Sequence, residues 1–155
     1  MRNLLLVFTL LFSACSIKNY EQTQSKIIII KTPKLKFADL GYLRNSGDAI
    51  ELELFVAGKS IEKFTINHLV CVNVGCMSKS GFNEEYLNAA YPDDLLQNIL
   101  LGREIYAGEG SLRTEDGFVQ QIKTKSVDIK YVVKSKTIFF KDRKNRIIFK
   151  IKDVK

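Results

Sequence analysis

The sequence contains a single histidine, and several common catalytic signatures are missing from it. A Ser-His-Asp or Cys-His unit could be built only on His68, which stands in the apolar context of residues 67–70, where a structural role is more typical. There is no glycine-rich phosphate loop, no paired-cysteine zinc motif and no His-x-x-x-His spacing. The sequence therefore predicts a protein that is not an enzyme and that needs neither a cofactor nor a metal ion.

The chain also lacks an apolar run long enough to span a bilayer. Its longest apolar segment covers residues 4–14, ends in two small residues and is followed by Cys15. A membrane-spanning helix needs about 20 apolar residues. Arg2 precedes the segment, and the chain becomes polar from Ser16 onward. A short basic start, an apolar core and small residues at its end are typical of an export signal.

The position of Cys15 resembles the lipobox of bacterial lipoproteins, with Phe12 where that family usually has leucine. The resemblance implies that residues 1–14 are removed and that acyl chains such as palmitate on Cys15 anchor the protein. It also implies, from Ser16 after the cysteine, an outer-membrane location facing the periplasm. Residues 15–33 would be the lipidated N-terminus and a tether leading into a first short strand at 26–31. The alternatives are an ordinary signal peptide with an incidental cysteine, or a buried N-terminal helix.

Two cysteines remain once Cys15 is set aside. Cys71 and Cys76 are an even pair, which favours a disulfide in an oxidising compartment. Five residues of straight strand span about 16 Å, too far for such a bond. A bridge therefore requires the chain to bend at 73–75, where Gly75 permits it. The alternative adds His68 to the two cysteines as a zinc ligand, although this spacing matches no standard zinc site.

Positive charge is concentrated in the last third of the chain. The formal net charge is +7, and the segment from Phe118 to the end carries 12 Lys and Arg against three Asp. On an exported protein such a segment has few nucleic-acid partners but many anionic lipid head groups to meet. The sequence therefore predicts no nucleic-acid partner and leaves two interpretations of the basic segment, one of which is contact with anionic lipid. The alternative is that the lysines line solvated strand faces and protect sheet edges.

Alternation of apolar and polar residues predicts strands in most of the chain, with one helical interval. The clearest strand lies within 48–57, another covers 127–133, and 136–141 with 146–152 form a hairpin. Residues 92–102 predict a helix, because Pro92 suits a first turn, acidic residues follow it and Gly102 suits a left-handed stop. A shorter helical turn capped by Asn83 is expected at 83–89. The order predicts an α+β fold, mostly of antiparallel β-strands, with one or two short helices.

This order of elements resembles the LolB and LolA family of lipoprotein-handling envelope proteins. The resemblance rests on 91–102, which is similar to that family's helix between two halves of a sheet, and on 127–154, a strand followed by a final hairpin. It implies a single domain over 34–155, a curved sheet or unclosed β-barrel whose apolar concave face is covered by helices and accepts an acyl chain of a lipid or lipoprotein.

The expected lining of that cavity comes from three strands and the covering helix. The residues are Ile50, Leu52, Leu54, Val56, Leu95, Leu96, Ile99, Leu100, Val127, Ile129, Tyr131, Ile147 and Phe149. The same side chains could equally form a filled core. The alternative function is then a structural or assembly lipoprotein that docks to a protein complex of the cell envelope through a sheet edge or its basic face.

Overall fold

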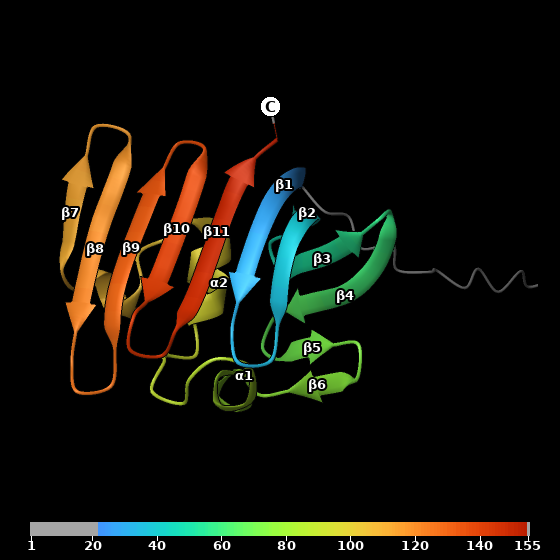
Figure 1. Ribbon diagram of the computed structural model, residues 1–155, viewed down its shortest axis with the longest axis horizontal. Coiled ribbons are helices and arrows are strands. Elements are labelled where there is room, and N and C mark those ends of the chain that lie inside the picture. The colour runs from blue at the N-terminus through green and yellow to red at the C-terminus, as the bar shows by residue number, and fades with distance from the viewer. Residues whose placement is uncertain (1–21, 155) are drawn as a thin grey trace, which may run out of the picture.

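The computed structural model describes residues 22–154, which form one antiparallel sheet with helices on one side (Figure 1). Cys15 and the predicted signal 1–14 lie outside this range. The strands are β1 (Gln22–Lys31), β2 (Lys36–Asn45), β3 (Ile50–Val56), β4 (Lys59–Ile66), β5 (Val70–Val72), β6 (Gly75–Met77), β7 (Ser111–Thr114), β8 (Gly117–Lys123), β9 (Asp128–Lys134), β10 (Thr137–Asp142) and β11 (Ile147–Asp153). The helices are α1 (Lys79–Tyr86) and α2 (Leu95–Leu101), with a short 3-10 turn at Tyr106–Gly108.

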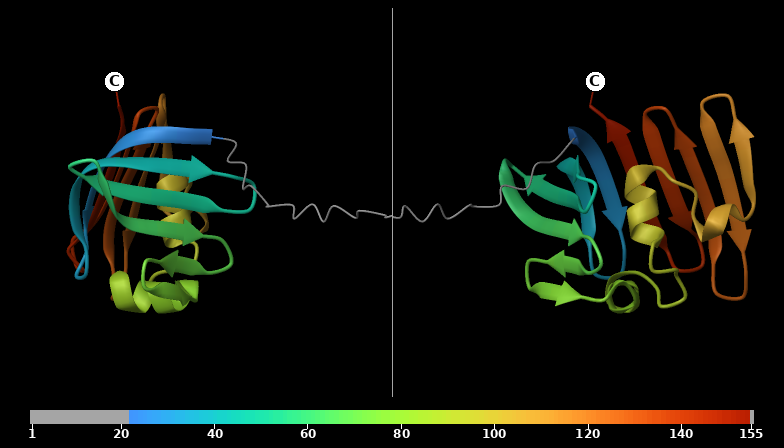
Figure 2. Two further views of the ribbon diagram at one scale, coloured as in Figure 1. Left: turned by 90° about the vertical axis from the view of Figure 1, so that its right-hand side faces the viewer. Right: turned by 180° about the vertical axis from the view of Figure 1, so that it is seen from behind.

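Two strand meanders, one from each half of the chain, meet at the centre of the sheet. The strand order is β6-β5-β4-β3-β2-β1-β11-β10-β9-β8-β7. The first and last strands are therefore neighbours, and Ile28 lies opposite Ile151 in their antiparallel register. The edge strands β6 and β7 do not pair with each other, so the sheet is unclosed. Figure 2 shows that it is also curved. This architecture confirms the predicted fold class.

The central position of β1 corrects the predicted domain boundary at residue 34. The sequence placed 15–33 in a tether with a short strand at 26–31, but β1 begins at Gln22 and pairs with β2 along its whole length. From Lys26 onward it also pairs with β11. Residues 22–25 are polar and exposed because only one neighbouring strand flanks them, so they carry no apolar alternation. The domain therefore includes all of β1.

The sheet has an apolar inner face, which packs against the helices, and an outer face. Alternate residues of each strand point to opposite faces, and Ile28, Leu52, Tyr131 and Phe149 are among the buried inner residues. In the rear view of Figure 2, α2 lies in front of the strands of the C-terminal half, and α1 closes one end of the layer. Figure 1 therefore presents the outer face of that half, with α2 behind it.

The predicted helix at 92–102 is present, and its end is the one expected. Gly102 has a φ of 63° and its N–H contacts the carbonyls of Asn98 and Ile99, so it is a left-handed cap. The helix begins at Leu95, after Asp94. Its four buried residues are Leu95, Leu96, Ile99 and Leu100.

The earlier helix differs from the prediction. It begins at Lys79, and its cap is Ser78, whose Oγ accepts a hydrogen bond from Gly81 N at 3.0 Å. Asn83 lies inside the helix and is buried. Its side-chain amide donates to the carbonyls of Tyr91 and Pro92 at 3.2 and 3.0 Å. The predicted cap is therefore a buried support for the loop between α1 and α2.

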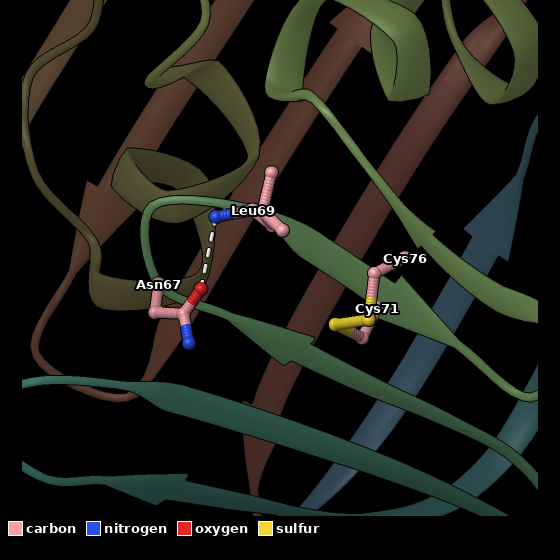
Figure 3. The surroundings of a disulfide bond; sticks show 4 residues. All are labelled: Asn67, Leu69, Cys71 and Cys76. Atoms are coloured by element: carbon pink, nitrogen blue, oxygen red, sulfur yellow. Dashed lines mark hydrogen bonds between the residues drawn. A yellow bond between two sulfur atoms is a disulfide. The ribbon is translucent and has the colours of Figure 1, made fainter.

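Cys71 and Cys76 form a disulfide, as the pairing argument predicts (Figure 3). They are directly opposite residues of the hairpin β5–β6, and their Cα atoms are 3.9 Å apart. The bend occurs at 73–74, and Gly75 begins the returning strand. A second tight turn precedes β5, where Leu69 N donates to Asn67 Oδ1 at 2.9 Å. With both sulfurs bonded to each other, the zinc alternative is wrong.

Candidate functional site

The expected lining residues lie together between the inner face and α2, with one exception. Twelve of the thirteen are at most 5 % exposed: Ile50, Leu52, Leu54, Leu95, Leu96, Ile99, Leu100, Val127, Ile129, Tyr131, Ile147 and Phe149. Val56 is 45 % exposed. Val56 is the last residue of β3, directly before the turn at 57–58, where burial along the strand falls off. Val56 is therefore not part of the lining.

The interior beneath the helices is filled rather than hollow. The apolar cavity against α1 measures about 20 Å³. A space of at least about 10–15 Å³ is needed for one water molecule, whereas pockets for drug-sized ligands measure about 300–1,000 Å³. Of the expected lining residues only Leu52, Leu96 and Phe149 reach this cavity. The other buried members pack against one another as core.

Sequence reasoning missed most of the cavity wall. The remaining lining residues come from the end of β1, its turn into β2, β4, and α1 with its C-cap: Ile30, Thr32, Leu35, Phe64, Phe82, Tyr86 and Leu87. Phe82 stacks on Tyr86 with ring centroids 4.8 Å apart, and it meets Phe64 edge-on at 6.1 Å. The prediction missed them because it placed the start of this helix at Asn83. A helix capped by Ser78 includes Phe82 and Tyr86, four residues apart and therefore on one face.

Buried polar groups fasten the helical layer to the inner face at three places. Tyr91 Oη donates to Asp142 Oδ2 at 2.7 Å, and Tyr131 Oη donates to the carbonyl of Asn98 at 3.3 Å. Gln120, fully buried on β8, accepts from Ile105 N at 3.1 Å and donates to the carbonyls of Ile105 and Glu109, each at 2.6 Å. These contacts hold the α1–α2 loop, α2 and the segment that follows it.

Asp142 is the most densely bonded of these groups. Its side chain is buried, and burial alone would raise the pKa of the carboxyl group. Hydrogen bonds from Tyr91 and Asn145 outweigh burial and hold that pKa below its ordinary value. The Asn145 amide lies 2.6 Å away. Further donors are the backbone amides of Asp128, Lys144 and Asn145.

Tyr91 and Tyr131 are neutral hydrogen-bond donors. Burial, followed by the hydrogen bond to Asp142, raises the pKa of Tyr91 far above its usual range, and burial does the same for Tyr131. Burial also raises the pKa of Tyr106 to about 12. A charged Asp142 beside a neutral Tyr91 forms a fixed structural contact and is not poised for proton transfer.

In contrast, α1 is held to the sheet mainly by apolar contacts. Its polar contacts to other elements are the Asn83 bonds to the following loop, a bond from Lys79 Nζ to Gln97 of α2 at 3.0 Å, and an ion pair between Glu85 and Lys34 at 3.9 Å. Both partners of that ion pair are half exposed, so it adds little to stability. Among the described residues, no hydrogen bond or ion pair therefore joins α1 directly to a strand of the sheet.

His68 lies in the exposed turn between β4 and β5 and not in an apolar site. Within residues 22–154 no three His, Cys, Asp or Glu side chains gather in a way that could hold a metal ion. In the same range no helix is both long and apolar enough to cross a membrane.

Comparisons with protein-family models, with curated proteins and with solved structures found no match for the chain.

Proposed function

We propose that the protein is a lipid-anchored envelope protein that receives the acyl chain of a lipid or lipoprotein between α1 and the inner face. The observation that carries the proposal is the mostly apolar cavity beneath α1, where no described hydrogen bond or ion pair joins the helix directly to a β-strand. Support also comes from the unclosed, helix-covered sheet, which is the arrangement implied by the LolB and LolA resemblance. The anchor at Cys15 rests on the lipobox resemblance.

Binding in this place requires α1 to move away from the sheet. The 20 Å³ cavity is too small for an acyl chain, so Phe82 and Leu87 must separate from Phe64 and Leu96 as the ligand enters. Each buried methylene of the ligand contributes about 0.8 kcal/mol. A chain of ten or more methylenes therefore offsets the loss of several side-chain contacts. No covalent step is needed, and the ligand can leave by the same route.

Binding of dansyl-undecanoic acid tests the proposal. The full chain carrying Cys15→Ser would be titrated, and we expect saturable fluorescence enhancement. Leu35→Gln at the cavity mouth should weaken binding at least about tenfold, because an amide replaces an apolar wall. Leu101→Gln is the matched control, since Leu101 is partly buried against the core but does not line the cavity. Absence of saturable binding, or equal losses in both variants, would contradict acyl-chain binding.

A second function, docking to a protein complex of the envelope, is favoured by the filled interior. The free edge strand β7 offers unpaired backbone groups, and its Leu112 is 72 % exposed. A photocrosslinking amino acid at position 112 would then capture a discrete protein partner. The control is the same amino acid at position 74, because Val74 is 86 % exposed at the tip of the β5–β6 hairpin. Equal capture at both positions, or none at 112, would count against docking at this edge.

A further inference from the structure

The outer face of the C-terminal half carries a row of apolar side chains that runs across the strands. Leu112, Val119, Val132 and Phe139 are directly opposite one another in successive pairs from β7 to β10. Phe139 faces Lys150 of β11, and Lys150 faces Ile29 of β1. Apart from the exposed Leu112, the apolar members are partly buried. The row therefore presents a shallow apolar band on the side of the sheet away from the helices. Figure 1 turns this face of the C-terminal strands toward the viewer.

Lysines flank this band on both sides. We define the lysine face as the outward residues Lys31, Lys130, Lys134, Lys141, Lys150 and Lys152. Lys130 is directly opposite Lys141, and Lys31 is directly opposite Lys36 of β2. Like charges directly opposite each other destabilise a sheet. The fold therefore carries an electrostatic cost on this surface that an anionic partner would relieve.

The chain neutralises charge elsewhere on the same side of the sheet. On β2–β4, Arg44 Nη1 lies 2.6 Å from Glu51 and 2.8 Å from Glu53, and Lys63 Nζ lies 2.7 Å from Glu51. Among the described residues, no member of the lysine face forms an ion pair with a carboxylate. On the outer face of β2–β4, basic side chains are therefore paired with carboxylates, whereas the lysine face keeps its positive charge without such partners.

We propose that the lysine face and its apolar band bind the anionic head groups of a phospholipid bilayer. Lysines near an anionic surface attract phosphates, and the band between them suits the boundary between head groups and acyl chains. Gln22 follows Cys15 by seven residue steps, a span of at most about 25 Å. An acylated Cys15 would hold Gln22, the start of β1, within that distance of the bilayer and would thereby keep the lysine face near the membrane. This last step rests on the proposed anchor; the charge pattern does not.

Vesicle co-sedimentation tests the proposal separately from the anchor and from acyl-chain binding. The full chain with Cys15→Ser would be mixed with vesicles of phosphatidylcholine alone or with added phosphatidylglycerol. We expect preferential binding to the anionic vesicles. It should be strong in 0.1 M salt, where screening acts over about 10 Å, and lost in 1 M salt, where it acts over about 3 Å. Absence of this preference would overturn the lipid proposal and leave the anchor and the acyl cavity untouched.

A matched pair of variants locates the binding surface. The triple variant Lys130→Gln, Lys141→Gln and Lys150→Gln should weaken anionic binding at least about tenfold. The control triple Lys34→Gln, Lys59→Gln and Arg103→Gln removes the same charge from positions outside the lysine face and should keep most of the binding. Equal losses in the two triples would overturn the assignment. A photocrosslinking amino acid at position 130 in cells should yield lipid adducts, and a discrete protein adduct would assign the face to an acidic protein instead.

Discussion

At the scale of single residues, buried polar side chains decide how the helical layer sits on the sheet. Asp142, Gln120 and Asn83 are each buried and each hydrogen-bonded to a loop of the helical layer or to a turn. Apolar alternation cannot reveal them, because it identifies only the residues that exclude water. Strand alternation and helical periodicity did identify twelve of the thirteen expected interior residues, and they failed at Val56, the last residue of β3 before its hairpin turn.

Replacing the Asp142 carboxylate tests its role as a structural acceptor. Asp142→Asn turns an acceptor oxygen into a donor that faces Tyr91 and Asn145, so the variant should lose about 1–3 kcal/mol of unfolding free energy at pH 7. The folded pKa of Asp142 is depressed. Its contribution is therefore complete above the unfolded pKa of about 3.9 and is lost as the pH falls through the folded pKa.

Urea denaturation at several pH values measures both effects. The difference between the natural chain and Asp142→Asn should be largest near neutral pH and should shrink in acid. Asp48→Asn, in the exposed turn before β3, is the control and should change little. A difference that persists unchanged well below pH 3.9 would show that the charge on Asp142 is not what stabilises the fold.

At the scale of elements, the sequence predicted α2 better than α1 because α2 has conventional signals at both ends. Gly102 adopts the left-handed conformation that its position suggested. For α1 the cap is Ser78, which precedes Lys79, and no apolar periodicity marks the first turn. Asn83 looked like a cap because asparagine is favoured there, but tertiary contacts with the following loop use its amide instead.

The disulfide Cys71–Cys76 stabilises the short hairpin β5–β6 at the edge of the sheet. Each strand has only three residues, and β6 is an edge strand. The variant Cys71→Ser with Cys76→Ser should lose about 2 kcal/mol of unfolding free energy, the chain-entropy value for so short a loop. A reductant should lower the urea midpoint of the natural chain to about that of the variant, and it should leave the midpoint of the variant unchanged. Sensitivity of both chains to reductant would contradict this assignment.

At the scale of the whole molecule, the sheet is one body because β1 joins its two halves. Sequence periodicity indicated strands and one helical interval but not which strands are neighbours, since pairing between the two ends of the chain leaves no local trace. Nor could it decide between a cavity and a core, because both bury the same residues. Packing of Phe82 against Phe64 and Tyr86 leaves only 20 Å³ of cavity beneath α1.

Two adjacent residues of β1 test its central position. Ile28 is fully buried on the inner face, whereas Ile27 is 43 % exposed on the outer face. Ile28→Asn should cost about 3–5 kcal/mol, because it removes core packing and buries an unpaired amide. Ile27→Asn should cost less than about 1 kcal/mol. Thermal unfolding followed by circular dichroism gives the midpoint of each variant. Equal midpoints for the two variants would contradict the central position of β1, because a tether has no buried face.

The pairing of the first strand with the last also sets the order of events when the protein is made. Lys26 and Asp153, which form an ion pair across β1 and β11, are 127 residues apart in the chain. Contacts at such separation slow folding, because the loop entropy is lost before the contact forms. The N-terminal half cannot complete its sheet while β11 is still unavailable. One edge of β1 therefore stays unpaired until β11 has been made, and the two halves become a single sheet only after that step.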